Sequence, residues 1–130
     1  RHAILRAIAG NPHIRLFEPV TDRLSFARLL ASADALVHGC EAETFCMVAA
    51  EARASQVPII VPDRGGAADH AGEGSAVYGS GSGVDAARAI LECLRTPKPQ
   101  GSVGVRTTHD HFRDLFADYE RLVGKLRLAA

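Results

Sequence analysis

Two carboxylates, Glu43 and Glu51, lie eight positions apart and flank a segment that carries no charge. The apolar run over residues 45–50 predicts a helix that begins close to Glu43. The start of a helix presents unpaired backbone N–H groups and the positive end of the helix dipole, and both attract phosphate. Carboxylates near that point can accept hydrogen bonds from the hydroxyl groups of a sugar or a ribose. The spacing therefore indicates a site for a nucleotide sugar.

Helices and strands alternate along the chain, which places this segment within an α/β fold. The expected strands are residues 13–17, 35–38, 57–61 and 76–78, and the expected helices are residues 1–9, 22–33, 45–55, 67–71, 85–95 and 109–126. We therefore predict a partial Rossmann-like, doubly wound parallel sheet of about four strands, with helices on both faces. Ligands of such sheets bind beyond the carboxyl ends of the strands, and Glu43 follows one of them.

Several local features of these elements follow from residue type. Thr21 or Asp22 can cap the second helix, and Thr44 is the expected N-cap of a largely buried helix over residues 45–55. The glycine- and serine-rich residues 79–83 are expected to form a flexible connector, and residues 96–104 a loop. The last helix is expected to close the fold with an apolar seam formed by Phe112, Leu115, Phe116, Tyr119, Leu122 and Val123.

Composition excludes several classes of function. The 130 residues are 47% hydrophobic and 23% charged, as in an ordinary single domain. Fifteen basic and fifteen acidic residues cancel, so we expect no nucleic-acid partner. No run of apolar residues is long enough for a membrane span, and no signal-peptide pattern is present. Three cysteines without a CxxC pair favour reduced thiols and a cytoplasmic location.

Cysteine and histidine side chains near the strand at residues 35–38 raise a second chemical possibility. Cys40 and Cys46 lie close to His38 in sequence and could form a thiol nucleophile with a base, or a set of metal ligands. The spacing places no third group beside them, and small buried cysteines are common. We therefore expect no metal here, and expect His38 and His70 near the ligand end of the sheet as polar lining residues.

The segment from Glu43 to Gly66 also resembles a known family pattern. That pattern is E-x-F-G-L-x-x-x-E-A, followed by G-x-P-V-V and a G-G-x-x-E turn. The corresponding residues here are Glu43-Thr44-Phe45-Cys46-Met47-Val48-Ala49-Ala50-Glu51-Ala52, then Gln56-Val57-Pro58-Ile59-Ile60 and Gly65-Gly66-Ala67-Ala68-Asp69. The chain is thus similar to the C-terminal, donor-binding domain of family 4 (group 1) retaining glycosyltransferases, which have a two-domain fold of the B type. The likeness extends over nearly the whole chain in the right order.

The resemblance implies a role for each matching position. Glu43 would be the catalytic-site carboxylate that faces the donor sugar, and Glu51 would hold the ribose hydroxyls. The donor sugar and diphosphate would be bound by Glu43, Thr44, Phe45, Cys46, Met47 and Val48, and the base would lie against Phe17, Glu18, Pro19 and Val20. The donor would be a nucleotide-diphosphate sugar, such as GDP-mannose or a UDP-sugar, used as a co-substrate without a cofactor. The acceptor would be a glycan or a lipid-linked molecule, in polysaccharide biosynthesis at the cytoplasmic side of a membrane.

Differences from the family pattern define the alternative hypothesis. Cys46 and Gln56 replace family glycines, and Asp69 replaces a glutamate. Two strand–helix units that carry an Arg and a Lys clamp, and the acceptor-binding N-terminal domain, are expected to precede this chain in its parent. We therefore expect residues 1–130 to be a partial domain, inactive alone, in which strand 13–17 lacks its neighbours and an exposed sheet edge could pair with a second copy. The alternative is a non-catalytic nucleotide-binding or interaction module of the same fold.

Overall fold

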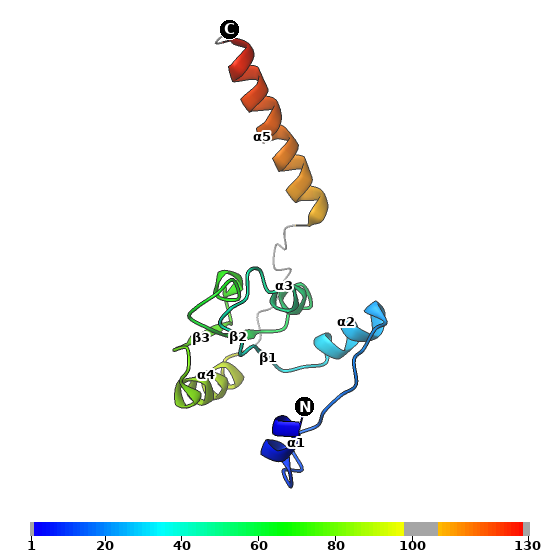
Figure 1. Ribbon diagram of the computed structural model, residues 1–130, viewed down its shortest axis with the longest axis vertical. Coiled ribbons are helices and arrows are strands. Elements are labelled where there is room, and N and C mark those ends of the chain that lie inside the picture. The colour runs from blue at the N-terminus through cyan, green and yellow to red at the C-terminus, as the bar shows by residue number, and fades with distance from the viewer. Residues whose placement is uncertain (1, 98–106, 129–130) are drawn as a thin grey trace.

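The centre of the molecule is a three-stranded parallel sheet (Figure 1). The computed structural model describes residues 2–97 and 107–128. Strands β1 (Leu36–Val37), β2 (Ile59–Pro62) and β3 (Ala76–Tyr78) lie side by side in chain order. Leu36 pairs with Ile59, and Ile60 pairs with Ala76, all in parallel register. The predicted α/β class with a parallel sheet is confirmed.

Helices cover both faces of the sheet, as predicted. Alternate residues of a strand point to opposite faces, so β2 is buried from two sides. On one face Ile59 and Val61 pack in a cluster with Ala49 and Ala52 of α3 (Met47–Ala54). On the other face Ile60 packs against Ala89 and Cys93 of α4 (Gly83–Arg95). The two clusters together form the core.

The other helices follow local sequence signals. Helix α1 spans His2–Ile8, and α2 spans Arg23–Ala31. Asp22 caps α2 by accepting a hydrogen bond of 2.7 Å from the backbone N–H of Ser25, and its hydrogen bonds with Ser25 lower the pKa of Asp22. A single 3₁₀ turn, η1 (Ala68–His70), follows the Gly65–Gly66 turn. The described helices include none that is both long enough and apolar enough to span a membrane.

Residues 13–17 do not form the predicted strand. This segment is irregular, and Ile14, Leu16 and Phe17 are 45%, 50% and 69% exposed. A strand needs a neighbour to accept and donate its backbone hydrogen bonds, and none of the described residues supplies one here. The described sheet therefore has three strands rather than about four, and β1 lies at its edge. Residues 13–17 thus have no partner strand in the described part of the chain.

The last helix forms but does not close the fold. Helix α5 (Thr108–Leu128) stands away from the sheet in Figure 1. Five of the six residues of its predicted seam are solvent-exposed, at 47% for Phe112, 59% for Phe116 and 54% for Tyr119, and Leu115 is half-buried. Local interactions specify this helix: Thr107 Oγ1 accepts from the Asp110 N–H, and Arg113 pairs with Asp110. Most of the loop predicted at residues 96–104 lies outside the described residues.

Hydrogen bonds hold residues 79–83, which were predicted to be a flexible connector. Asp63, just after β2, accepts hydrogen bonds from the Ser80 N–H at 3.0 Å and the Ser80 hydroxyl at 2.6 Å. These two bonds lower the pKa of Asp63. Ser82 caps α4 by accepting from the Asp85 N–H at 3.1 Å, and Gly83 is already helical. The connection thereby ties the end of β2 to the start of α4.

Helix α3 ends in a Schellman motif with an unusual residue at its left-handed position. The Val57 N–H donates to the Ala52 carbonyl and the Gln56 N–H donates to the Arg53 carbonyl, both at 2.9 Å. Gln56 has φ 59°, where glycine is normally favoured. The hydrogen-bond pattern that a family glycine would support is thus formed here by a glutamine under backbone strain.

We predict that Gln56→Gly raises the free energy of unfolding by about 0.5–1 kcal/mol. A side chain in the left-handed region costs about 1–2 kcal/mol, and the extra chain entropy of glycine offsets part of that gain. Gln56 is exposed, so no packing is lost. Urea unfolding of the two proteins measures the difference, and Gln56→Ala, which keeps the strain, serves as the control. A Gly variant no more stable than the Ala variant would contradict the prediction.

Candidate functional site

The loop between β1 and α3 begins from a point fixed to the sheet. The His38 N–H donates to the Ile60 carbonyl at 2.9 Å, which continues the β1–β2 ladder by one residue. The Tyr78 hydroxyl donates to the His38 carbonyl at 2.8 Å. Burial, together with the negative charge of Glu41, raises the pKa of Tyr78. The loop therefore leaves the carboxyl end of β1 from an anchored residue.

The Gly65–Gly66 turn holds the middle of this loop by direct contact between backbones. The Gly66 N–H donates to the Glu43 carbonyl at 2.7 Å. A Cβ atom at Gly66 would lie 2.1 Å from the Thr44 carbonyl oxygen, and one at Gly65 would lie 2.7 Å from the Glu41 carbonyl oxygen. Only glycine permits this approach. The position of Glu43 is therefore set by the turn that follows β2.

His70 holds the end of the loop. Its Nε2 is hydrogen-bonded to the Phe45 carbonyl, and its ring packs edge-on against the Phe45 ring, with centroids 4.8 Å apart at 90°. His70 belongs to η1, so a second segment after β2 supports the same loop. The structure thus places His70 beside the predicted site, where it positions Phe45.

Helix α3 begins later than predicted, and Thr44 is not its cap. The N-cap residue is Cys46, which has φ 62° and ψ 70° and forms no side-chain capping bond. Its side chain is only 3% exposed and packs in the core cluster with Ala49 and Val57. Tertiary contact overrides the local capping preference, because the backbone of Thr44 is pressed against Gly66. The side chain of Cys46, which replaces the family glycine, is thereby accommodated inside the core.

Glu51 lies farther along α3 and lines a groove between α2 and α3. The half-buried Glu51 shares this cavity of about 310 Å³ with Val20, Thr21, Arg23, Phe26, Ala27, Leu30, Ala54 and Ser55. The structure thus brings Glu51 together with Val20, one of the four residues predicted to contact a base. Phe17, Glu18 and Pro19 are exposed and do not line this groove. Arg23 adds a positive charge to it.

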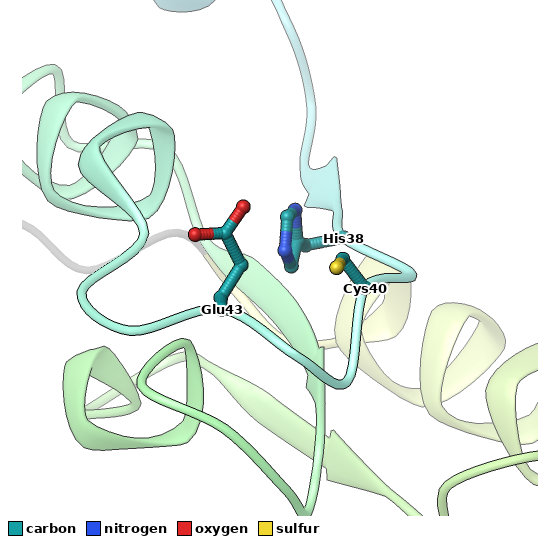
Figure 2. A group of neighbouring side chains, drawn as sticks. All are labelled: His38, Cys40 and Glu43. Atoms are coloured by element: carbon teal, nitrogen blue, oxygen red, sulfur yellow. The ribbon is translucent and has the colours of Figure 1, made fainter.

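Glu43 lies beside two further side chains that can bind a metal. Figure 2 shows His38, Cys40 and Glu43 together at the carboxyl end of β1. A ring nitrogen of His38, the Sγ of Cys40 and a carboxylate oxygen of Glu43 all lie within 4.8 Å of one another. The sequence suggested His38, Cys40 and Cys46 but supplied no further group. Cys46 lies in the core instead, and Glu43 completes the cluster. The spacing His38-x-Cys40-x-x-Glu43 directly after a strand is the signal that could have indicated Glu43.

Comparison with known proteins matches this site region to one family. Residues 10–107 match the family model described as glycosyl transferases group 1. A segment of 43 residues is 54% identical to a GDP-mannose-dependent alpha-mannosyltransferase of Mycobacterium tuberculosis, covering 33% of this chain and 11% of that protein. A segment of 45 residues is 51% identical to the protein of the same description from Mycolicibacterium smegmatis, covering 35% of this chain and 12% of that protein. The matched segments thus span about an eighth or less of these relatives.

We predict that Gly66→Ala destabilises the protein by about 2–3 kcal/mol, because the new methyl group would overlap the Thr44 carbonyl and force the two backbone segments apart. Thermal unfolding measures the change. Gly83→Ala is the matched control, since a Cβ at Gly83 meets no atom within 4 Å. Equal stability of the two variants would show that the close contact is not required.

Proposed function

Because the chain belongs to the group 1 glycosyl transferase family, we propose that it is the donor-binding part of a retaining enzyme that uses a nucleotide-diphosphate sugar. GDP-mannose is the donor we propose, since both relatives are described as dependent on it, and a UDP-sugar is the alternative. The family match covers most of the chain and includes the whole of the site region.

The observation that carries the proposal is the anchored loop that presents Glu43 at the carboxyl end of β1, directly before α3. In open α/β sheets ligands bind at this edge. The half-buried Glu43 is held by the Gly66 contact through its backbone, so its carboxylate remains available for a ligand. We propose that this carboxylate accepts hydrogen bonds from the hydroxyls of the donor sugar.

The start of α3 is the proposed site for the diphosphate. The amides of Phe45, Cys46, Met47 and Val48 surround the opening of the helix, and no side chain caps it. The first turn of α3 contains no acidic residue that would repel an anion. The helix dipole and free N–H groups would therefore stabilise the charge that develops on the leaving diphosphate.

The groove beside Glu51 is the proposed site for the nucleoside. Glu51 lies four residues beyond the start of α3, or about 6 Å along the helix axis. Its carboxylate would accept hydrogen bonds from the ribose hydroxyls, and Val20 would contact the base at the same groove. We propose that Phe17, Glu18 and Pro19 complete the base pocket from the segment that precedes α2.

Other parts of the proposed enzyme would lie outside residues 1–130. We propose an acceptor-binding N-terminal domain and a basic diphosphate clamp from outside this chain, with a glycan or lipid-linked acceptor. No cofactor is needed for the transfer that we propose. Residues 1–130 alone would bind donor weakly and would not transfer sugar.

A non-catalytic nucleotide-binding module is the second candidate. Two non-glycine residues at left-handed positions, Cys46 and Gln56, favour it, since they stand where the family pattern has glycine. Sugar transfer by the full-length parent would decide against this candidate.

We predict that Glu43→Ala and Glu51→Ala each weaken GDP-mannose binding by about 10- to 100-fold in the full-length parent. Each change removes charge-assisted hydrogen bonds worth about 1.5–3 kcal/mol. Isothermal titration calorimetry measures the affinity. Glu73→Gln is the control, since Glu73 is exposed and lies in the turn before β3. The assignment of the two carboxylates fails if neither alanine variant differs from the control.

A further inference from the structure

We propose that His38, Cys40 and Glu43 form a binding site for a zinc ion. Their three ligand atoms lie within 4.8 Å of one another (Figure 2). In a tetrahedral zinc site such atoms stand about 3.3–3.6 Å apart. The thiol of Cys40 is exposed and Glu43 is only half-buried, so rotation of these two side chains can close the remaining distance.

The ligand types favour zinc over a harder cation. One imidazole, one thiolate and one carboxylate suit a borderline-soft metal, whereas calcium and magnesium select oxygen ligands. The two anionic ligands would neutralise the charge of Zn²⁺. Three protein ligands leave a fourth position for water or for an oxygen of a ligand.

A second observation points to a ligand at the same place. The Nε2 atom of His38 is buried and has no hydrogen-bond partner among the residues that the structure describes. An unsatisfied buried nitrogen is costly, so a partner from outside the protein is expected. Coordination of a zinc ion through Nε2 would supply this missing partner.

The loop is organised for binding before the metal arrives. The His38 backbone is held by Ile60 and Tyr78, and the Glu43 carbonyl is held by Gly66. Little chain entropy is therefore lost when the ligands converge. Cys40 is the one exposed cysteine, whereas Cys46 and Cys93 are buried. Cys40 is thus the one thiol that a metal ion can reach from solvent.

The proposed zinc site has a consequence for the donor, and this part rests on the proposed function. The Glu43 carboxylate would be a zinc ligand and also the acceptor of hydrogen bonds from the sugar hydroxyls. One carboxylate cannot do both fully at the same time. Bound zinc would then compete with the donor, and the free-metal concentration would set how much of the enzyme can take GDP-mannose.

The test is a zinc titration of the metal-stripped full-length protein against a chromophoric chelator. We expect the unaltered protein to bind one Zn²⁺ ion and Cys40→Ser to bind it at least about 100-fold more weakly. Even the loss of a residue that only supports a metal ligand lowers metal affinity by about 10–100-fold. His38→Gln should show the same loss. His13→Gln, which alters an exposed histidine outside the cluster, should bind as the unaltered protein does. Replacing zinc with Co²⁺ should give a thiolate charge-transfer band that is absent in Cys40→Ser.

Two results would overturn the site: no Zn²⁺ taken from the chelator by the unaltered protein, or equal zinc affinity in the unaltered protein and Cys40→Ser.

A second titration measures GDP-mannose binding with and without zinc. We expect zinc to weaken donor binding in the unaltered protein but not in Cys40→Ser, which keeps Glu43. Zinc bound through Cys40 without effect on the donor would refute the competition. A protein that binds zinc but neither GDP-mannose nor a UDP-sugar would refute the proposed function and leave the metal site standing.

Discussion

The contact between the Gly65–Gly66 turn and the backbone of residues 41–45 is the constraint on which the site depends. It joins the segment after β1 to the segment after β2, and it has no space for a side chain. The hydrogen bond from Gly66 to the Glu43 carbonyl and the support of Phe45 by His70 fix two points of the loop. Because these contacts hold the loop through its backbone atoms, they position the Glu43 side chain and leave its carboxylate available for a ligand. Such preorganisation is what a hydroxyl-binding carboxylate or a metal ligand requires.

The small sheet provides the rigidity that this loop needs. Strand β2 is buried from both faces, with Ile59 and Val61 toward α3 and Ile60 toward α4. The loop that carries Glu43 therefore starts from β1, a two-residue edge strand, but derives its fixed geometry from β2 and the turn after it. The bonds between Asp63 and Ser80 extend this support to the start of α4. The site is organised around the strand that is most deeply buried.

The sequence predicted those elements whose cause is local and failed where the cause is tertiary. Apolar runs and caps such as Asp22 located α2, β2 and α4, since hydrophobic periodicity and capping act within a few residues. Residues 13–17 have the pattern of a strand but no neighbour, and α5 has an apolar seam but no surface beneath it in the described structure. The grouping of Glu43 with His38 and Cys40 depends on how the loop folds back, which spacing alone did not specify.

The start of α3 lies later in the chain than the sequence predicted, and the observed position favours anion binding. If Thr44 capped α3, its hydroxyl would occupy one of the first free amides and compete with a phosphate for it. The observed start at Cys46 leaves the helix without a side-chain cap, because the thiol lies in the core. The left-handed conformation at Cys46 carries a strain cost, and the packing of its side chain with Ala49 and Val57 offsets it. Cys46, at a position where the family pattern has glycine, therefore leaves the helix opening accessible, which is compatible with the proposed donor binding.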